Sequence, residues 1–162
     1  MSDVKFVTAW RRNNPQHAED VKAYWERTQL VQDPAKRERW THQLCTLVYA
    51  DGRVIADSTA ELIMLPGLRQ RFAMCRSSVD PEFRRKGLGA EITGYYRIIL
   101  EAWAMEHPEE KVMGVAVALN SKQLVEKQRD PLWLERGIDM AIVGYMPTGE
   151  QIRVGWFRNV RI

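Results

Sequence analysis

The chain has 162 residues, of which 45% are hydrophobic and 28% are charged, and its formal net charge at pH 7 is +3. These values are typical of one soluble globular domain, here residues 1–162, that is large enough to build a sizeable core. The mild positive charge permits an anionic ligand but is far below that of a dedicated nucleic-acid-binding protein, so we expect no nucleic-acid partner.

Targeting signals and cysteine spacing indicate where the protein is located and which state its cysteines take. No N-terminal stretch has a signal-peptide pattern and no apolar run approaches the ~18 residues of a membrane span, so we expect a cytoplasmic protein without a membrane partner. Cys45 and Cys75 lie in apolar surroundings without CxxC spacing. This pattern favours two buried reduced thiols over a disulfide or a metal site.

The N-terminal region predicts one strand and two helices. Residues 4–10 alternate between apolar and polar side chains, which is typical of a short strand, and residues 13–15 (Asn-Asn-Pro) break it. Apolar side chains at helical spacing predict a helix over residues 18–30. Asp33 is suited to cap a second short helix that runs to Trp40, with proline at its first position.

Three strands follow. Residues 43–50 and 54–65 are strand-like, and the Asp-Gly pair at 51–52 between them is a strong hairpin signal. The Pro-Gly pair at 66–67 marks another turn, and residues 71–79 form the next strand.

The centre of the chain predicts a strand–helix–strand crossover. Apolar side chains recur at helical spacing from Leu88 to Trp103, which indicates an amphipathic helix that ends near His107. Residues 112–119 (VMGVAVAL) are a continuous apolar run, typical of a strand that is buried on both faces.

The C-terminal region predicts a helix over 121–129, with Ser121 as a cap, and a helical turn over 132–136 that ends at Gly137. Two final strands, 140–146 and 151–157, flank a turn that contains Pro147, Thr148 and Gly149. The element order predicts an α+β (α/β) fold with a mixed, largely antiparallel sheet and one central βαβ crossover.

Residues 79–91, VDPEFRRKGLGAE, combine three cations with two glycines at the start of the central helix. Glycines let backbone N–H groups approach a phosphate without Cβ obstruction, and the helix dipole adds a favourable field. The pattern favours anion binding over a solvated basic loop that only caps a helix. It does not match the nucleotide fingerprints, because the lysine precedes the glycines and Ile92 occupies the third glycine position of GxGxxG.

The same residues resemble the GNAT superfamily of acyl-CoA-dependent N-acyltransferases, whose members carry V-x-P-x-x-[RQ]-x-x-G-x-[GA] after the fourth strand. The matching positions are Val79, Pro81, Arg84, Gly87 and Gly89. The resemblance implies a GNAT fold, with a sheet of about seven strands flanked by about four helices. It also implies acetyl-CoA, or another acyl-CoA, as the acyl-donor cosubstrate.

By position, the resemblance also implies the residues that hold the cofactor. In the family, loop amides bind the CoA pyrophosphate, and the end of the preceding strand pairs with the pantetheine arm. An Asn often follows the fifth strand and contacts the cofactor; Asn120 stands there, although a plain strand-ending or helix-capping role fits it equally well. The implied residues are Ser77, Ser78, Val79, Arg84, Arg85, Lys86, Gly87, Leu88, Gly89, Ala90 and Asn120.

The family's usual acid and base positions are vacant in this sequence. Many members place a tyrosine, the general acid toward the CoA sulfur, four residues before a Gly-Phe pair. Gly137 and Ile138 occupy that pair here, and Trp133 stands at the tyrosine position. An indole N–H donates a hydrogen bond but does not deliver a proton at useful pH. Two positions that carry a catalytic glutamate in other members are Ala73 and Val115.

Three titratable residues remain as candidates, and none is named catalytic. Asp57 and Glu61 are interpreted as solvent-facing strand residues, and His42 as a helix-end or surface imidazole. Catalysis through an ordered water and positioning alone, with the thiolate protonated from solvent, stays open because an oriented amine needs only modest assistance.

The tryptophans divide into two groups. Trp25, Trp40 and Trp103 lie at helix-core spacing, which favours packing. Trp133 and Trp156 fall in the region that borders the acceptor cleft in the family. There, ordinary core packing competes with an aromatic wall that would suit an apolar acceptor or a longer acyl chain.

The sequence as a whole predicts direct acyl transfer from acyl-CoA to a primary amine, carried by a small molecule or a peptide, without a metal. Acceptor selection would fall to residues 15–42 and 147–150, and a homodimer is compatible with the family. The rival is a non-catalytic acyl-CoA-binding or regulatory module. A transferase that uses an acyl carrier protein or an aminoacyl donor is disfavoured by the intact pyrophosphate loop.

Overall fold

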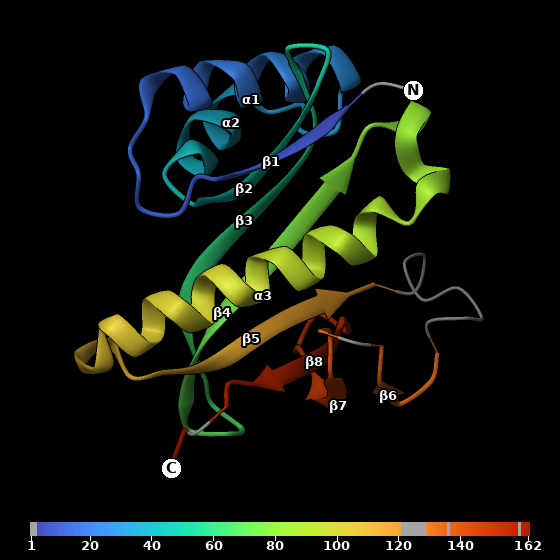
Figure 1. Cartoon of the computed structure of the whole chain (residues 1–162). Helices are drawn as coiled ribbons and strands as arrows, with labels where there is room; N and C mark the ends of the chain where they lie inside the picture. The colour runs from blue at the N-terminus through green and yellow to red at the C-terminus, as the bar shows by residue number, and fades with distance from the viewer. Residues whose placement is uncertain (1–2, 121–128, 136, 159) are drawn as a thin grey trace. The chain divides into compact units, whose positions relative to one another are not determined.

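The computed structural model describes residues 3–120, 129–135, 137–158 and 160–162. Within them the chain forms strands, three α-helices and two short 3₁₀ helices (Figure 1). In chain order the elements are β1 (Val4–Thr8), α1 (Pro15–Thr28), α2 (Pro34–Thr41), β2 (Leu44–Ala50), β3 (Arg53–Leu65), β4 (Gln70–Val79), the 3₁₀ helix η1 (Pro81–Lys86), α3 (Leu88–Glu106), the 3₁₀ helix η2 (Pro108–Glu110), β5 (Val112–Leu119), β6 (Leu132–Trp133), β7 (Met140–Tyr145) and β8 (Gln151–Trp156).

The strands are ordered β1-β2-β3-β4-β5-β8-β7-β6 in one eight-stranded sheet. The pairs β1–β2, β2–β3, β5–β8, β8–β7 and β7–β6 are antiparallel, whereas β4 and β5 are parallel and are joined through α3. The predicted mixed sheet and its βαβ crossover are therefore confirmed. The described part holds eight strands and three α-helices, against about seven and about four expected.

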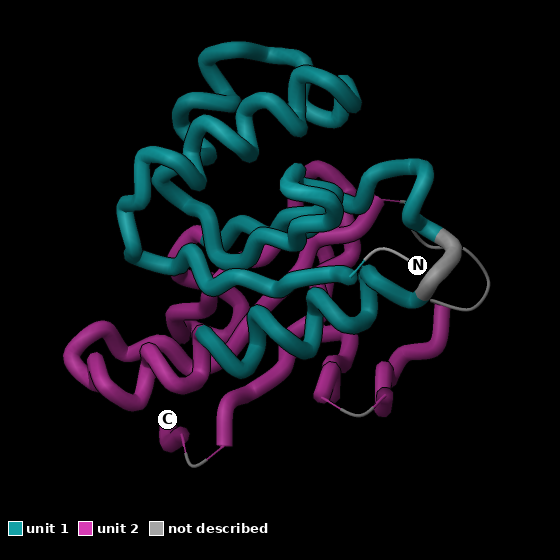
Figure 2. The backbone as a smooth tube through the Cα atoms, turned by 45° about the horizontal axis from the view of Figure 1, so that its top comes forward, with its two compact units in different colours: residues 1–60, 76–99 teal, residues 61–75, 100–162 magenta. Residues whose placement is uncertain are grey.

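The contacts of the chain form two compact units (Figure 2). The first contains residues 1–60 and 76–99, and the second contains residues 61–75 and 100–162. The single domain inferred from the sequence stays a prediction. None of the helices in the described ranges is both long and apolar enough to cross a membrane.

In the first unit, α1 starts earlier than the sequence predicts. The Asn14 side chain accepts hydrogen bonds from the N–H groups of Gln16 and His17, at 2.9 and 3.4 Å, and Pro15 occupies the first helical position. The Asn-Pro pair therefore opens the helix that it was expected only to precede. The same arrangement at Asp33, which caps α2, is confirmed.

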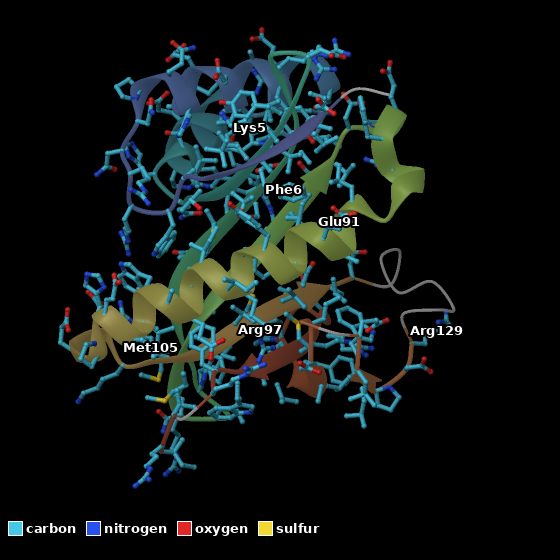
Figure 3. The ribbon with its side chains drawn as sticks, viewed as in Figure 1. Lys5, Phe6, Glu91, Arg97, Met105 and Arg129 are labelled. Atoms are coloured by element: carbon cyan, nitrogen blue, oxygen red, sulfur yellow. The ribbon has the colours of Figure 1, made fainter. Side chains whose placement is uncertain are left out.

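Helices cover both faces of β1 in this unit. Val7 packs with the buried cluster that contains Val21 and Trp25 of α1. Phe6, labelled in Figure 3, instead meets Tyr95 of α3, with ring centroids 5.1 Å apart. Since successive side chains of a strand point to opposite faces, α1 and the first half of α3 lie on opposite faces of β1. Trp40 packs edge-on against Trp25 at 6.1 Å, so the predicted packing of both indoles is confirmed.

The hairpin between β2 and β3 turns where the sequence predicts. Asp51 and Gly52 both have positive φ, 51° and 78°, as a two-residue type I′ turn requires. Cys45 on β2 and Cys75 on β4 are free and buried, which confirms the prediction of two reduced thiols.

In the second unit, one prediction is wrong. Residues 132–136, expected as a helical turn, begin with the short strand β6, in which Leu132 and Trp133 pair with Ala141 and Met140 of β7. The Pro131 carbonyl accepts the Ile142 N–H at 3.0 Å, so pairing with β7, which lies farther along the chain, holds this segment extended. Gly137 has the expected positive φ of 85° but lies in a turn. The helix predicted over 121–129 lies, except for its last residue, outside the described residues.

Candidate functional site

The segment from β4 to α3, for which the sequence predicts anion binding, forms a loop inside the first unit. β4 ends at Val79, η1 follows, and Gly87 takes a left-handed conformation with φ of 69° before α3 begins at Leu88. The Glu91 N–H donates to Gly87 O at 3.2 Å. The amides of Leu88, Gly89 and Ala90 thus form the first helical turn, whose N–H groups have no carbonyl partner within an α-helix. This end of a helix favours an anion.

The surface above this turn is open. A Cβ added at Gly87 or Gly89 would meet no atom within 4 Å, and both glycines and Ala90 are exposed. Leu88, by contrast, is buried and anchors the turn to the core. A phosphate group can therefore approach the backbone closely. Arg85 and Lys86 belong to η1, and their side chains lie outside the described part of the structure.

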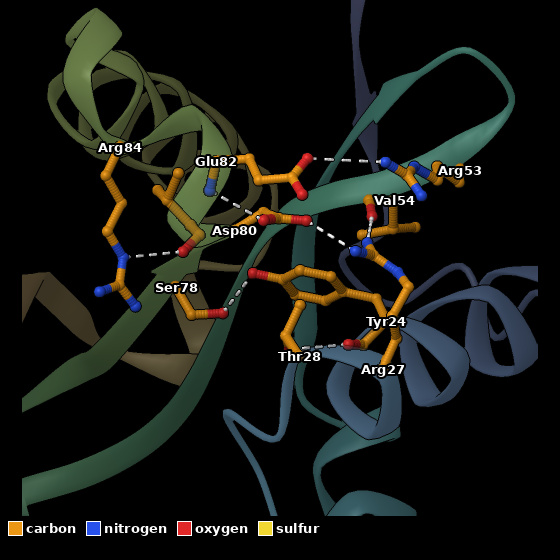
Figure 4. A network of polar contacts seen from close by, with 10 residues as sticks. Tyr24, Arg27, Thr28, Arg53, Val54, Ser78, Asp80, Glu82 and Arg84 are labelled. Atoms are coloured by element: carbon orange, nitrogen blue, oxygen red, sulfur yellow. Dashed lines mark hydrogen bonds and ion pairs between the residues drawn. The ribbon is translucent and has the colours of Figure 1, made fainter.

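Arg84 folds back onto the end of β4. Its Nε donates to Val79 O at 3.1 Å while the side chain stays exposed (Figure 4). The arginine of the loop motif is therefore held next to the strand end that precedes the loop.

Asp80 fixes the start of the loop to two other elements. Its buried carboxylate accepts the Glu82 N–H at 3.0 Å and pairs with Arg27 Nη1 at 2.8 Å, and its own N–H donates to Ile55 O at 2.8 Å. Arg27 also donates to Val54 O at 3.1 Å. Burial opposes ionisation of Asp80, but the hydrogen bonds from Arg27 and from the Glu82 backbone outweigh it and hold the pKa below its ordinary value. The sequence reasoning missed this role, although Asp-Pro is a helix-start signal.

We expect Asp80→Asn to lower the free energy of unfolding at pH 7 by about 2 kcal/mol, because asparagine keeps the cap but loses the charged hydrogen bond to Arg27. Since the folded-state pKa is lowered, this contribution is present above the ordinary value of 3.8 and is lost as the pH falls through the folded-state pKa. Urea unfolding between pH 3 and pH 7 measures the difference.

The control for this prediction is Glu82→Gln. The Glu82 side chain forms a long, exposed ion pair with Arg53, at 3.9 Å, so its loss should change the free energy of unfolding by less than about 0.5 kcal/mol. An equal effect of the two variants would contradict the structural role of Asp80.

Three side chains from three elements form a hydrogen-bonded row beside the loop. Ser78 of β4 donates from Oγ to Asp57 Oδ1 of β3, and Tyr24 Oη of α1 lies 3.0 Å from Ser78 Oγ (Figure 4 shows the Tyr24–Ser78 contact). Because the single Ser78 hydroxyl proton is directed at Asp57, Tyr24 is the donor in its contact. The row therefore runs from Tyr24 through Ser78 to Asp57.

The expectation that Asp57 faces solvent is wrong, because its side chain is fully buried. β3 lies between β2 and β4, and all its residues from Val54 to Ala60 are buried. A strand covered on both faces leaves no solvent side for alternation to reveal. The one available signal is that Asp57 is the only charged residue in a run of small side chains, ADSTA. Glu61, just beyond this run, is exposed as predicted.

Burial sets the charge states of this row. It raises the pKa of Asp57 to about 6, against the opposing effects of the Ser78 hydrogen bond and the nearby Arg76 charge. Burial also raises the pKa of Tyr24, and it lowers that of Arg76, whose guanidinium lies 3.2 Å from the ring centroid of Trp40. At neutral pH, Asp57 is therefore mostly ionised and Tyr24 is protonated, which fixes the direction of the hydrogen bonds.

The positions that carry an acid or a base in the family hold none here. Ala73 and Val115 are fully buried and face each other in the β4–β5 register. Trp133 packs under the buried Arg153 guanidinium, which lies 4.0 Å from its ring centroid. His42 caps the end of α2 and is exposed, as expected.

The remaining residues singled out in the sequence lie in the second unit, each in a different environment. Asn120 is exposed directly after β5. Trp156 is 38% exposed and meets Phe72 edge-on at 5.0 Å. Trp103 stacks on His107 at 4.7 Å, in accord with packing. Within the described residues no cluster of three or more His, Cys, Asp or Glu side chains could hold a metal ion.

Residues 15–42 and 147–150 are expected to select the acceptor, and each of these two segments lines a cavity. In the first unit, a polar cavity of about 250 Å³ lies along α1 and α2, and its charged lining includes Glu19, Lys22 and Glu38. Lys22 contacts the two carboxylates at 2.8 and 3.1 Å. In the second unit, Pro147 belongs to an apolar cavity of about 400 Å³ whose lining includes Tyr145.

The fold has clear relatives among solved structures. A GNAT-family acetyltransferase from Streptococcus pneumoniae superposes with a TM-score of 0.55 at 11% identity, over 96% of this chain and all of that one. The proposed acetyltransferase YncA from Salmonella typhimurium, solved with its cofactor acetyl-CoA, gives 0.55 at 12% identity, over 100% and 97% of the two chains. A bacterial toxin gives 0.53 at 10% identity, over 98% and 92%. No family model matches the sequence, and the search of curated proteins gives no significant match.

Proposed function

Since this chain has the fold of the GNAT acetyltransferases, we propose that it is an N-acyltransferase that transfers an acetyl or other acyl group from acyl-CoA to a primary amine. The observation that carries the proposal is the open first turn of α3, where the space beside Gly87 and Gly89 is empty and neither residue carries a Cβ. An anion such as the CoA pyrophosphate fits this turn.

The cofactor-binding residues we propose are those that the sequence implies. The amides of residues 85–90 hold the pyrophosphate, and Arg84, Arg85 and Lys86 add positive charge around it. Residues 77–79 offer backbone groups to the pantetheine arm, and Asn120 is a further contact. Acetyl-CoA supplies the activated acyl group.

The protein's part in the chemistry is orientation and charge stabilisation. A backbone N–H near the end of β4 donates to the carbonyl oxygen as negative charge develops on it. The bound amine attacks directly, and the thiolate leaves. The acceptor is a small-molecule or peptide amine, selected by the polar cavity of α1 and α2 and by residues 147–150. A homodimer and a cytoplasmic location stay predictions.

Calorimetry with acetyl-CoA tests the loop. We expect the wild-type protein to bind, and Gly87→Glu or Gly89→Glu to abolish binding, because each carboxylate would occupy the space that the phosphates need. Gly67→Glu is the control: this exposed glycine lies in the second unit and is equally open, so the variant adds the same charge outside the loop. Unchanged binding in both loop variants would refute the proposed site.

The amine acceptor is sought by following thiol release from acetyl-CoA against amino acids, polyamines, aminoglycosides and peptides. Turnover with one class identifies the enzyme and its substrate together. If no amine of the panel causes thiol release while acetyl-CoA still binds, the result would instead support the non-catalytic acyl-CoA-binding module. The apolar residues at 73, 115 and 133 favour this alternative.

A further inference from the structure

We propose that Tyr24, Ser78 and Asp57 form a proton relay, in which Ser78 Oγ accepts a proton from the acceptor amine while it passes its own proton to Asp57. The relay rests on the proposed function and supplies the base that the vacant positions Ala73 and Val115 lack.

Ser78 is the member of the row that is not fully buried, and we assign it the contact with the amine. Asp57 is 0% exposed and Tyr24 is 2% exposed, whereas Ser78 is half-buried and lies next to Val79 at the end of β4. Its hydroxyl donates to Asp57 and accepts from Tyr24 at 3.0 Å. A serine oxygen has two lone pairs, so one acceptor site remains for an amine N–H.

The surroundings keep Asp57 ready to accept a proton. Burial raises its pKa to about 6, yet the carboxylate stays mostly ionised at neutral pH with the help of Arg76 on β4. A base of this strength is suited to reversible transfer near physiological pH. The other titratable group on the row is Tyr24 of α1, which is itself acted on by Asp80 and Arg27.

Some buried polar atoms at the row lack hydrogen bonds that a purely structural network would be expected to provide. Among the described residues, Asp57 Oδ2 and Arg76 Nη1 are buried without a hydrogen bond of good geometry, although Trp25 Nε1 and the Arg76 charge both act on the Asp57 carboxylate and lower its pKa. Such groups cost stability, and packing alone gives no reason to keep them. A carboxylate that changes its protonation state during turnover gives such a reason.

The amine nitrogen forms its bond to the acyl carbon, the C–S bond breaks, and its electron pair leaves with sulfur as the CoA thiolate. One amine proton moves to Ser78 Oγ as the Ser78 proton moves to Asp57 Oδ1. Asp57 then returns a proton through Ser78 to the thiolate or to solvent, and the row is restored.

The test is the pH dependence of kcat/KM between pH 5 and 9, with the best amine from the panel and with acetyl-CoA affinity measured in parallel. We expect Asp57→Asn and Ser78→Ala to lower kcat/KM by about 100-fold and to remove a wild-type inflection near pH 6, with acetyl-CoA affinity changed by less than about twofold. Ser78→Thr keeps a hydroxyl and should restore most of the activity.

Tyr24→Phe should lower the rate less, because it removes only the hydrogen bond that orients Ser78. Its matched control is Tyr49→Phe, which deletes a hydroxyl that donates to Asp20 at 2.7 Å away from the row and should leave the profile unchanged.

Each outcome is decisive. Wild-type rates and an unchanged inflection in Asp57→Asn and Ser78→Ala would overturn the relay and leave the proposed function intact. A wild-type protein that does not bind acetyl-CoA, or binds it without acting on any amine, would overturn both. If Asp57→Asn fails to fold, the comparison of Ser78→Ala with Ser78→Thr decides, since a structural role for the hydroxyl would not move the inflection.

Discussion

Gly114→Ala is expected to lower the free energy of unfolding by about 3 kcal/mol, at the upper end of the cost of overpacking. A Cβ at this position of β5 would lie 2.2 Å from Gly155 O and 3.0 Å from both Gly155 C and Trp156 Cα of β8. All three atoms are backbone of the paired strand, so relief requires the two strands to separate. Close strand approach, and not conformational freedom, is what glycine provides here.

Chemical denaturation of the wild type and the variant measures this loss. The control is Gly94→Ala in the middle of α3, where an added Cβ meets no atom within 4 Å. That change should raise the free energy of unfolding by about 0.5–1 kcal/mol, because alanine favours helix. A Gly114→Ala protein as stable as the wild type would show that β5 and β8 are not in the register that pairs Gly114 with Trp156.

Asp57→Asn should change how stability depends on pH. Because burial raises the folded-state pKa of Asp57 from an ordinary 3.8 to about 6, its contribution is fully present below pH 3.8 and is lost as the pH rises through about 6. This loss corresponds to about 3 kcal/mol. Asparagine does not ionise, so the stability of the variant relative to the wild type should rise by about that amount between pH 4 and pH 7.

Urea unfolding at several pH values gives this difference directly. Glu61→Gln is the matched control, because Glu61 lies on the same strand but is exposed, and its variant should follow the wild-type pH dependence. A constant difference between Asp57→Asn and the wild type would mean that Asp57 is not buried as an ionisable group. This test needs neither cofactor nor substrate, so it examines the buried carboxylate independently of any activity.

Elements with strong local signals were predicted well from the sequence. The apolar run of β5 has the predicted bounds, Val112–Leu119, and the Asp-Gly pair forms the predicted hairpin. The predicted secondary structure is wrong where two local signals compete, or where pairing with a distant strand determines the conformation. The sequence predicts a break at Asn14 and Pro15, which instead start α1, and a helical turn at Leu132 and Trp133, which instead pair with β7.

In the candidate site, too, the part formed by neighbouring residues is predicted from the sequence, and the part formed by distant residues is not. The glycine loop is contiguous in sequence, so its spacing alone predicts an anion-binding turn, and the structure shows that turn open. Tyr24, Asp57 and Ser78 are far apart in the chain and belong to a helix and two strands. No local pattern connects them, and the alternation rule placed Asp57 on the wrong side.

The sequence by itself therefore determined the crossover, the glycine turn and the absence of the family's usual acid and base, because each depends on neighbours along the chain. Only the tertiary structure decided that Asp57 is buried and that Ser78 joins it to Tyr24. Burial and charge state depend on what surrounds a strand, and β3, which lies between β2 and β4, is buried from Val54 to Ala60.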